Sequence, residues 1–490
     1  MGSIKQVTAM TEPAAKVSRG ALALLGGILL IAAALRGSAA AGDLWVDEVW
    51  SLYNIGRARA AASPGNWLAL FFHTNTHPLT TLSMILLGPE ASAFSYRVLS
   101  VVSGIATVAL AAVIGWRRSP REGLICAAMV CVSYPMVHYA GEARGYAPML
   151  LAALAAFWVL EHHLQAPSPG KAWAFITVSM LGLATHLTFI AVLAGLGVWA
   201  SVTLFQRSKT VVKALAKLTV LFGVQAIVIT AYGAVAVSNL VHTVLFILTV
   251  SDSVTIMADL TFGIDPYARL PAVALGVALT GAIWWIRRQG DGSWVFFAFI
   301  VVYPLAFILF DPVDANEPRY FLTSALFALI IAARSLAGLM AATRWTRTAA
   351  AGLLALFVIG NGLMLEKFRQ GGRGNYVGVL QTIAAAGIGD GEPARVSGYR
   401  ELRVGEVLRY YARKQGLGDT ISFVSIVEDE RNPAPWFIDG GFSDGFTARR
   451  PDPVISRPDG KGGTAPYRLM AVFPHWGFSG DSLAVYRRDR

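Results

Sequence analysis

The amino-acid sequence predicts a mainly α-helical, polytopic membrane protein that ends in a small α/β domain. Of the 490 residues, 55% are hydrophobic and only 14% are charged, which is too apolar for a soluble protein. Apolar runs long enough to cross a bilayer recur between residues 1 and 365. No such run occurs over 366–490, where 18 basic residues stand against 15 acidic ones. We therefore expect a membrane module over 1–365 and a soluble domain over 366–490.

The membrane module is expected to contain about eleven transmembrane helices. The first apolar run follows basic residues, as in a signal peptide, but we expect it to remain uncleaved because the later loop charges need it to set the orientation. The expected spans are 21–35, 93–115, 122–140, 146–160, 172–185, 188–206, 215–238, 270–286, 294–310, 320–336 and 348–365. Cys126 and Cys131 fall within one span and indicate small buried hydrophobes, not a disulfide.

The loop charges predict the orientation. With the N-terminus in the cytoplasm, the loops on that side carry 16 Lys or Arg against 4 Asp or Glu, and the other face carries 7 against 11. The positive-inside rule therefore places the C-terminal domain in the periplasm or outside the cell, on a protein of the cytoplasmic (inner) membrane. The net charge of +11 follows this asymmetry and does not indicate nucleic-acid binding.

The segments outside the spans have their own expected elements. The first outer loop, 40–92, should carry membrane-surface helices, including an amphipathic run that begins at Pro78 and ends at Leu87. In the soluble domain we expect a helix over Glu401–Lys414. The expected strands are Ala394–Gly398, Thr420–Val427, Tyr467–Phe473 and Ser482–Arg487.

Two adjacent carboxylates, Asp47 and Glu48, follow the first span directly. Carboxylates beside a bilayer are costly unless they are solvated or paired, so they are candidates for a functional site. The alternative is a solvated loop in which Trp45, Trp50 and Tyr53 form an interfacial aromatic belt.

Further polar clusters are expected on the same outer face, each at a helix end. They comprise His73–Leu79, Glu142–Tyr146 and Asn316–Tyr320, with Arg97 and His186 nearby. The simpler explanations are local. Glu142 could pair with Arg144, and Glu317 with Arg319. Arg97 could extend its side chain to the membrane interface. His73 and His77 could bind a metal, but the intervening residues favour capping. These explanations leave unexplained why all the clusters lie on one face.

The sequence contains no P-loop, dinucleotide fingerprint or His-Glu-x-x-His motif. An enzyme acting on the outer face cannot count on cytosolic nucleotides. An activated substrate would have to arrive on another carrier, and a lipid is the obvious one.

With these residues the chain resembles GT-C membrane glycosyltransferases that use polyprenyl-phosphate sugars. The branch it resembles includes protein O-mannosyltransferases, lipid A aminoarabinose transferases and rhizobial lipopolysaccharide galacturonosyltransferases. The matching motifs cover about the first 330 residues and are Trp45-Val-Asp-Glu-Val-Trp50, His77-Pro-Leu79, Arg97-Val-Leu-Ser100, Glu142-Ala-Arg-Gly-Tyr146, Thr185-His186 and Arg319-Tyr320. Three departures are a missing second proline after Pro78, Val98-Leu99 in place of Leu-Pro, and Gly145 in place of proline.

The resemblance implies an inverting transfer of a sugar to an envelope acceptor, which would be a lipopolysaccharide, glycolipid, polysaccharide or protein. Asp47 would be the base, with Glu48 as the second catalytic carboxylate or an orienting group. The residues implied to bind the donor phosphate are Arg144, Arg319, His77 and His186. The residues implied to bind or orient substrate are Glu142, Tyr146, Arg97, Glu317 and Tyr320. No cofactor is required, although a divalent metal assists some relatives.

The main alternative function is a transporter or flippase of a lipid-linked sugar. That function predicts ionisable residues in mid-membrane and two related halves with interrupted helices. The expected spans are nearly free of charge, and the polar clusters share one face. The sequence therefore favours the transferase.

The expected orientation gives a first testable prediction. Alkaline phosphatase fused after Arg490 should be active, because that end is expected outside, whereas a cytoplasmic reporter near Arg207 should be active inside. If phosphatase fused after Arg490 were inactive and a cytoplasmic reporter fused there were active, the orientation would be reversed. The predicted site would then face the cytoplasm.

Overall fold

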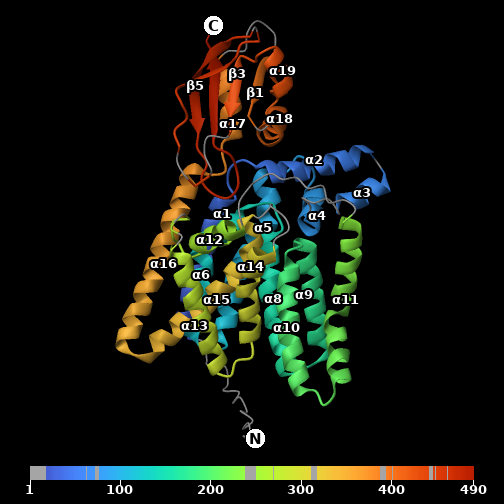
Figure 1. The fold of residues 1–490 in the computed structure, drawn as a ribbon, viewed down its shortest axis with the longest axis vertical. Coiled ribbons are helices and arrows are strands. Elements are labelled where there is room, and N and C mark those ends of the chain that lie inside the picture. The colour runs from blue at the N-terminus through green and yellow to red at the C-terminus, as the bar shows by residue number, and fades with distance from the viewer. Residues whose placement is uncertain are drawn as a thin grey trace.

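The computed structural model describes residues 18–61, 63–71, 77–237, 250–266, 268, 270–310, 317–386, 393–399, 401–440, 445–446, 449–460 and 462–489. Figure 1 shows a bundle of long helices with a sheet domain at one end. The start of the first helix lies toward the opposite end of the bundle. The two architectural parts predicted from the sequence are therefore present.

Seven helices in the described ranges are long and apolar enough to span a membrane, or eight if a bent pair forms one span. The seven are α1 (Arg19–Ala39), α5 (Ala93–Trp116), α8 (Tyr146–Gln165), α10 (Phe189–Arg207), α11 (Val211–Val237), α15 (Leu322–Ala342) and α16 (Arg344–Gly371). Three further expected spans form the helices α9 (Pro169–Thr185), α13 (Leu270–Arg288) and α14 (Trp294–Phe310), which are not among the seven. The chain is thus a multi-pass membrane protein, but the expected count of eleven is not confirmed.

The span expected at 122–140 is broken. It consists of α6 (Pro120–Val132), α7 (Tyr134–His138) and the 3-10 helix η1 (Tyr139–Gly141), with a bend of 67°. Pro135 has no N–H to donate to the carbonyl of Cys131 four residues earlier, so the helix cannot continue. The buried guanidinium of Arg36 donates to that carbonyl at 3.1 Å and to the Val130 carbonyl at 3.0 Å. Arg36 therefore provides hydrogen bonds to carbonyl groups at the end of α6, inside the bundle.

Segment 40–92, which was expected from the sequence to be the first outer loop, is largely helical. It contains α2 (Val46–Ala61), α3 (Pro64–Leu70) and α4 (Pro78–Leu87), and α2 crosses the end of the bundle in Figure 1. The helix predicted over 78–87 is confirmed. The alternative of a solvated loop around Asp47 is wrong, because Asp47 and Glu48 lie in the first turn of α2. A short helix not predicted from the sequence, α12 (Val250–Thr261), also packs at this end of the bundle.

The C-terminal domain is built on a six-stranded mixed sheet of order β2-β1-β3-β6-β5-β4. Its strands are β1 (Ala394–Gly398), β2 (Ile421–Phe423), β3 (Trp436–Asp439), β4 (Val454–Pro458), β5 (Thr464–Phe473) and β6 (Leu483–Arg488). Its helical elements are α17 (Tyr376–Ala385), the π-helical turn η3 (Glu401–Gly405), α18 (Glu406–Lys414) and α19 (Ile426–Arg431). β1 pairs in parallel with β2 and β3, and the remaining pairs are antiparallel.

The predicted elements of this domain are mostly confirmed. β1 has the expected bounds, and β5, β6 and the helix over 401–414 lie where they were expected. The strand expected over Thr420–Val427 is wrong in its second half, because Ser425 accepts a hydrogen bond from the Glu428 N–H and starts α19. β3 and β4 were not predicted. β3 has only four residues, and β4 is a mostly exposed edge strand that ends at Pro458.

The sheet domain packs on the outer loop, and the two parts share one hydrophobic cluster. Val46 and Val49 of α2 belong to it together with Leu380 of α17 and Leu408 of α18. Where α16 ends, Arg373 donates to the carbonyls of Ala39 at 2.6 Å and His138 at 2.8 Å. The Val377 N–H donates to the Asp43 carboxylate at 3.0 Å. The end of the first span and the soluble domain are therefore held together.

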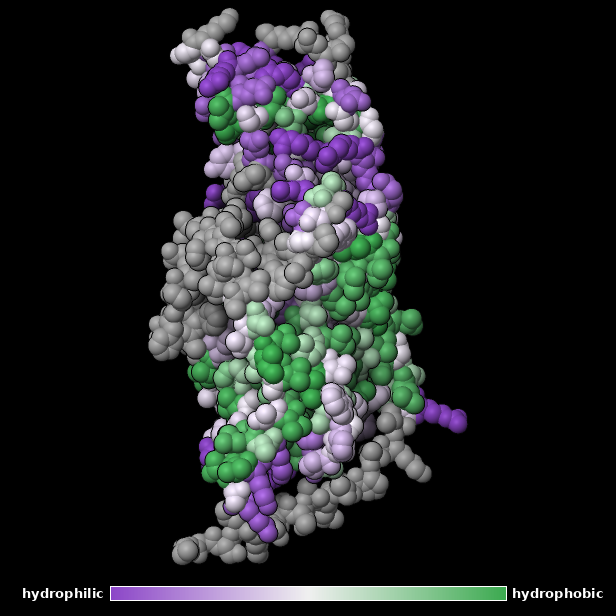
Figure 2. Space-filling model, turned by 90° about the vertical axis from the view of Figure 1, so that its right-hand side faces the viewer, coloured by the Kyte–Doolittle hydropathy of each residue, from purple (hydrophilic) through white to green (hydrophobic). Residues whose placement is uncertain are grey.

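The opposite end of the bundle is closed by a charge network. Asp291, before α14, pairs with Arg118 at 2.7 Å and with Arg334 at 2.8 Å. These pairs join three of the loops that were expected on the cytoplasmic side. Between the two ends, Figure 2 shows a broad apolar zone over the helices. Exposed side chains such as Leu30 of α1 and Leu356 of α16 fit contact with lipid chains.

Candidate functional site

Asp47 is the centre of a charged cluster at the end of the bundle that faces the sheet domain. Arg319, in the 3-10 helix η2 (Pro318–Phe321), donates from Nη1 to Asp47 Oδ2 at 3.0 Å. Arg144, just before α8, approaches the same oxygen with Nη2 at 3.6 Å. The Asp47 side chain is 19% exposed, so a ligand can still reach it. Three segments distant in sequence thus bring one carboxylate and two guanidinium groups together.

Arg319 has further neighbours that fix its direction. Its Nη2 lies 3.6 Å from Glu317, and its guanidinium carbon lies 5.9 Å from the centre of the Trp45 ring. Tyr320 is half-buried beside it in η2. The predicted ion pair of Glu317 with Arg319 is therefore present, but it is part of the Asp47 cluster. Asn316, at the start of this motif, lies outside the described residues.

Two histidines and a tyrosine form an aromatic group next to Arg144. The rings of His77 and His186 are 4.7 Å apart, and Tyr146 lies 4.8 Å from His186 and 5.4 Å from His77. The Arg144 guanidinium carbon is 6.0 Å from the Tyr146 ring. The structure therefore brings together three of the family motifs, from α4, from α8 and from the connection between α9 and α10.

The close approach of two of these motifs explains one departure from the family pattern. A Cβ atom on Gly145 would lie 1.9 Å from the Thr185 carbonyl oxygen, which is too short for any side chain. Glycine at this position lets the Arg144 segment pack directly on the turn that carries His186. The replacement of proline by Gly145 is thus a packing requirement in this chain.

Both histidines are held in the neutral state. Burial, and after it the Arg144 charge, lowers the pKa of His77 well below its usual value. Burial and the charges of Arg144 and Arg319 lower the pKa of His186 to about 3. Protonation of either ring would place a further positive charge in a buried region that already holds two guanidinium groups. At neutral pH both side chains are therefore uncharged hydrogen-bonding groups.

Glu48 and Arg97 lie beside this cluster as a fully buried ion pair. Arg97 Nε donates to Glu48 Oε1 at 2.9 Å and Nη2 donates to Oε2 at 2.6 Å, and both side chains are 0% exposed. The N–H groups of Trp45 and Ala143 donate to the same carboxylate at 3.1 and 2.7 Å. Arg97 also donates to the backbone carbonyls of Ala40, Gly42 and Asp43. Both carboxylate oxygens are therefore occupied, and Arg97 does not reach the interface as a surface arginine would.

Glu142 is not part of the Asp47 cluster. Its carboxylate lies 3.1 Å from His138 Nε2 and 3.5 Å from Arg373 Nε, at the contact with the sheet domain. The Ser479 hydroxyl lies 3.2 Å from the same nitrogen, His138 Nε2. The predicted pair of Glu142 with Arg144 is absent from the ion pairs between described residues. Sequence reasoning missed His138, although its position four residues before Glu142 was a usable signal.

No group of three or more His, Cys, Asp or Glu side chains that could hold a metal occurs within the described part of the chain. His73, the partner proposed for His77 in a metal site, lies outside that part. His77 instead precedes α4 as its N-cap residue without a side-chain capping bond. Its Nδ1 lies 3.2 Å from the Thr185 carbonyl oxygen, so its role is to join two loops.

Comparison with known structures identifies the fold. The structure of ArnT from Cupriavidus metallidurans in the apo state matches with a TM-score of 0.51 and 12% identity, over 95% of this chain and 97% of that chain. The structure of ArnT from the same organism bound to undecaprenyl phosphate matches with a TM-score of 0.48 and 12% identity, over 95% and 98%. No family model matches the sequence, and no curated protein matches it. The chain therefore shares the fold of the ArnT structure in the apo state, which agrees with the fold expected from its motifs.

The buried Glu48–Arg97 pair predicts a stability effect. Replacement of Arg97 by Ala leaves the Glu48 charge buried without its main partner, which should lower the free energy of unfolding by about 3–5 kcal/mol. Arg369→Ala, which removes an exposed arginine paired with Glu366, is the control and should change stability little. Unfolding of both variants in the same detergent is the measurement. Equal losses for the two variants would contradict the role assigned to Arg97.

The lowered pKa of His186 predicts a pH effect on stability. Above pH 6.5 the residue is neutral in both folded and unfolded chains, but between pH 6.5 and about 3 only the unfolded chain binds the proton. Lowering the pH from 7 to 5 should therefore cost about 2 kcal/mol through this residue. His186→Gln should remove that part of the loss, whereas His162→Gln, at a half-buried position near the end of α8, should not. Thermal unfolding at both pH values tests this, and an unchanged loss in His186→Gln would refute it.

Proposed function

We propose that this chain, which has the GT-C fold, is an inverting glycosyltransferase. It takes a sugar from a polyprenyl-phosphate carrier and transfers it to an envelope acceptor at the outer face of the cytoplasmic membrane. The observation that carries the proposal is the meeting of Asp47 with Arg144 and Arg319 at the end of the bundle beside the sheet domain. A base and a phosphate-binding pair are the groups that this reaction requires.

Asp47 is the base in this mechanism. The acceptor hydroxyl attacks the anomeric carbon as its proton passes to the Asp47 carboxylate, and the bond to the phosphate oxygen breaks. Attack from the side opposite the phosphate inverts the anomeric configuration. The partial exposure of Asp47 gives the acceptor access, which the fully buried Glu48 lacks.

Arg144 and Arg319 stabilise the leaving polyprenyl phosphate. Guanidinium groups donate two parallel hydrogen bonds to phosphate oxygens and remain charged throughout the reaction. Both guanidinium groups already point at Asp47. A phosphate bound to them would therefore lie across the site from the base. Their interaction with the phosphate strengthens as its negative charge grows, which lowers the barrier to transfer.

The two histidines add neutral hydrogen-bonding groups. His186 Nδ1 accepts from the Thr188 N–H at 3.1 Å, which leaves the proton on Nε2 for donation to a phosphate oxygen. His77 Nδ1 faces the Thr185 carbonyl, so that nitrogen carries the proton and Nε2 is an acceptor. Nε2 is buried and has no partner among the described residues. It can accept a hydrogen bond from a sugar hydroxyl.

Glu48 is a positioning residue in this proposal and not a second base. It binds the N–H of Trp45 before α2 and the N–H of Ala143 beside Arg144. Ser100 donates to the Arg144 carbonyl at 3.1 Å and supports the same segment. The buried carboxylate thus sets the distance between the base and one of the phosphate-binding arginines.

An apolar cavity supports the choice of a lipid-linked donor. It has a volume of about 790 Å³, lies between α12, α13, α14 and α15, and is lined by Phe321 and Ala325 among others. Phe321 follows Arg319 by two residues, so the cavity begins near the proposed phosphate position. An isoprenoid chain fits such a lining, and a nucleotide does not.

One observation favours the alternative of a flippase. The span of α6 and α7 is interrupted, as helices at transport sites often are. However, Pro135 and the capping guanidinium of Arg36 account for this break without a transported ligand. The Asp47 cluster also lies at the end of the bundle and not at its middle. We therefore retain the transferase.

The test is sugar transfer by the purified protein and its Asp47→Asn variant. The amide keeps the size of the side chain but cannot take the acceptor proton, so turnover should fall by about a hundred- to ten-thousand-fold. Arg144→Ala should weaken both donor binding and turnover because it contacts the phosphate before and during transfer. Arg431→Gln, at an exposed position on α19, is the matched control.

The same assay tests the donor class and the base. A polyprenyl-phosphate sugar should be consumed, and a nucleotide sugar should not. If the Asp47→Asn protein were fully active, the base would have to be another carboxylate. Transfer from a nucleotide sugar without any polyprenyl phosphate would end the proposal of a lipid-linked donor.

A further inference from the structure

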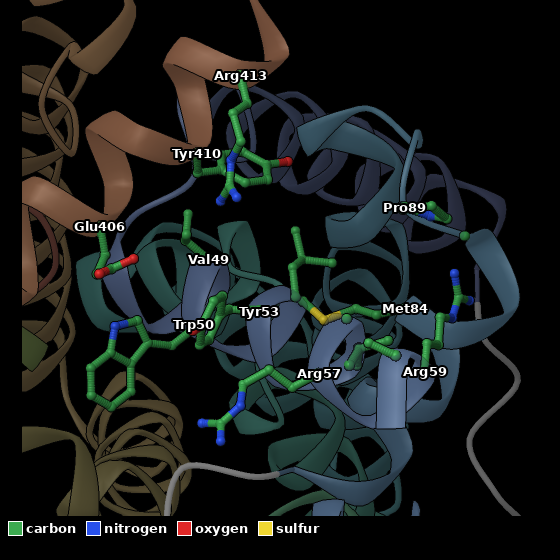
Figure 3. A pocket seen from close by; sticks show the side chains of 15 residues that line it. Val49, Trp50, Tyr53, Arg57, Arg59, Met84, Pro89, Glu406, Tyr410 and Arg413 are labelled. Atoms are coloured by element: carbon green, nitrogen blue, oxygen red, sulfur yellow. The ribbon is translucent and has the colours of Figure 1, made fainter. Parts of the chain in front are cut away.

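A second cavity lies along α2, beyond its first turn. It has a volume of about 540 Å³ and is bounded by α2, by the end of α4 and by α18 of the sheet domain (Figure 3). In Figure 3, Tyr410 and Arg413 extend from α18 over the side chains of α2. Asp47 does not line this cavity, so it is separate from the cluster proposed to carry out the transfer.

The cavity carries positive charge that the protein does not neutralise. Arg57, Arg59 and Arg413 line it and are exposed, and none of them forms an ion pair with a described carboxylate. Glu406 also lines it, but its carboxylate accepts from Arg409 at 2.7 Å. By contrast, the exposed Arg468 of the sheet domain pairs with Asp489 at 2.7 Å. Arg59 Nη2 donates to the Ile85 carbonyl at 3.1 Å, but none of the three guanidinium groups has a carboxylate partner among the described residues, so together they are complementary to an anionic ligand.

The remaining lining indicates what else the ligand contains. Trp50 and Tyr53 of α2 and Tyr410 of α18 line the cavity together with the arginines (Figure 3). Such rings offer flat apolar faces with polar edges, which suit a ring-shaped polar molecule. The volume falls in the range of about 300–1,000 Å³ typical of small-ligand sites, so a short chain segment fits and a folded protein does not.

We propose that this cavity binds a carboxylate-bearing oligosaccharide segment of the acceptor, an inference that rests on the proposed function. The sugar rings lie against Trp50, Tyr53 and Tyr410, and their carboxylates face the arginines. Because α2 rises about 1.5 Å per residue, Arg57 lies about 15 Å along the helix from Asp47. An acceptor chain of a few sugar units anchored in the cavity can therefore reach the base with its next hydroxyl. The cavity selects the acceptor and takes no part in the chemical step.

The test is a binding measurement that needs no transfer. Titration of the purified full-length protein with tetragalacturonate, followed by calorimetry, should show binding that weakens at high salt. Arg57→Gln combined with Arg413→Gln should weaken it at least tenfold. Arg431→Gln should bind as the wild type does. Asp47→Asn should also bind normally, so a failed transfer mechanism and a failed binding site give different results.

Other results of the same titration would overturn the proposal. Equal binding of neutral maltotetraose would show that charge is not recognised, and unchanged affinity in the double variant would show that the site lies elsewhere. If inorganic phosphate displaced tetragalacturonate at a concentration equal to that of the probe, the arginines would be a site for a phosphate group instead. Absence of tetragalacturonate binding to the wild type would exclude the site itself.

Discussion

The burial of the Glu48–Arg97 ion pair is the constraint on which the site depends. A charge removed from water is tolerated only when its partner and its hydrogen bonds are complete, and here both groups are fully buried and fully bonded. Arg97 binds three carbonyls of the connection between α1 and α2, while Glu48 binds N–H groups at the start of α2 and beside Arg144. The pair therefore determines where α2 begins, and with it the position of Asp47.

Helix α2 connects the two parts of the chain. Its first turn carries Asp47 above the bundle, and its apolar side chains enter a hydrophobic cluster formed with the sheet domain. Arg373 extends this contact by binding the carbonyls at the end of α1 and at the end of α7. The sheet domain thus supports the proposed site, and none of its described residues belongs to the Asp47 cluster. Its α18 also completes the arginine-lined cavity along α2.

Within the bundle, polar groups occur where the backbone requires them. Arg36 replaces the hydrogen bond that Pro135 cannot make, so a charge inside the membrane module has a structural cause. At the end of the bundle that faces the sheet domain, burial and nearby guanidinium groups keep His77 and His186 neutral. Positive charge is thereby concentrated in Arg144 and Arg319, where a phosphate can use it. Arg144 is as deeply buried as the two histidines, so the division between charged and neutral groups follows from residue type, because arginine is far more basic than histidine.

The sequence by itself determined the fold class, most helices and the elements β1, β5 and β6, because hydrophobic runs and strand alternation are local signals. It also placed Asp47, Arg144 and Arg319 among the candidate residues through their motifs. The resemblance implied that Asp47 is the base, but the sequence could not show that Glu48 is buried in an ion pair, because adjacent carboxylates differ only in the directions their side chains take in α2. Nor could it show that Glu142 binds His138 and Arg373, or that Arg36 ends α6. Arg373 lies far from Glu142 in the chain, and Arg36 lies far from α6. Only tertiary packing decides which of these distant charges meet and which of them remain open to a ligand.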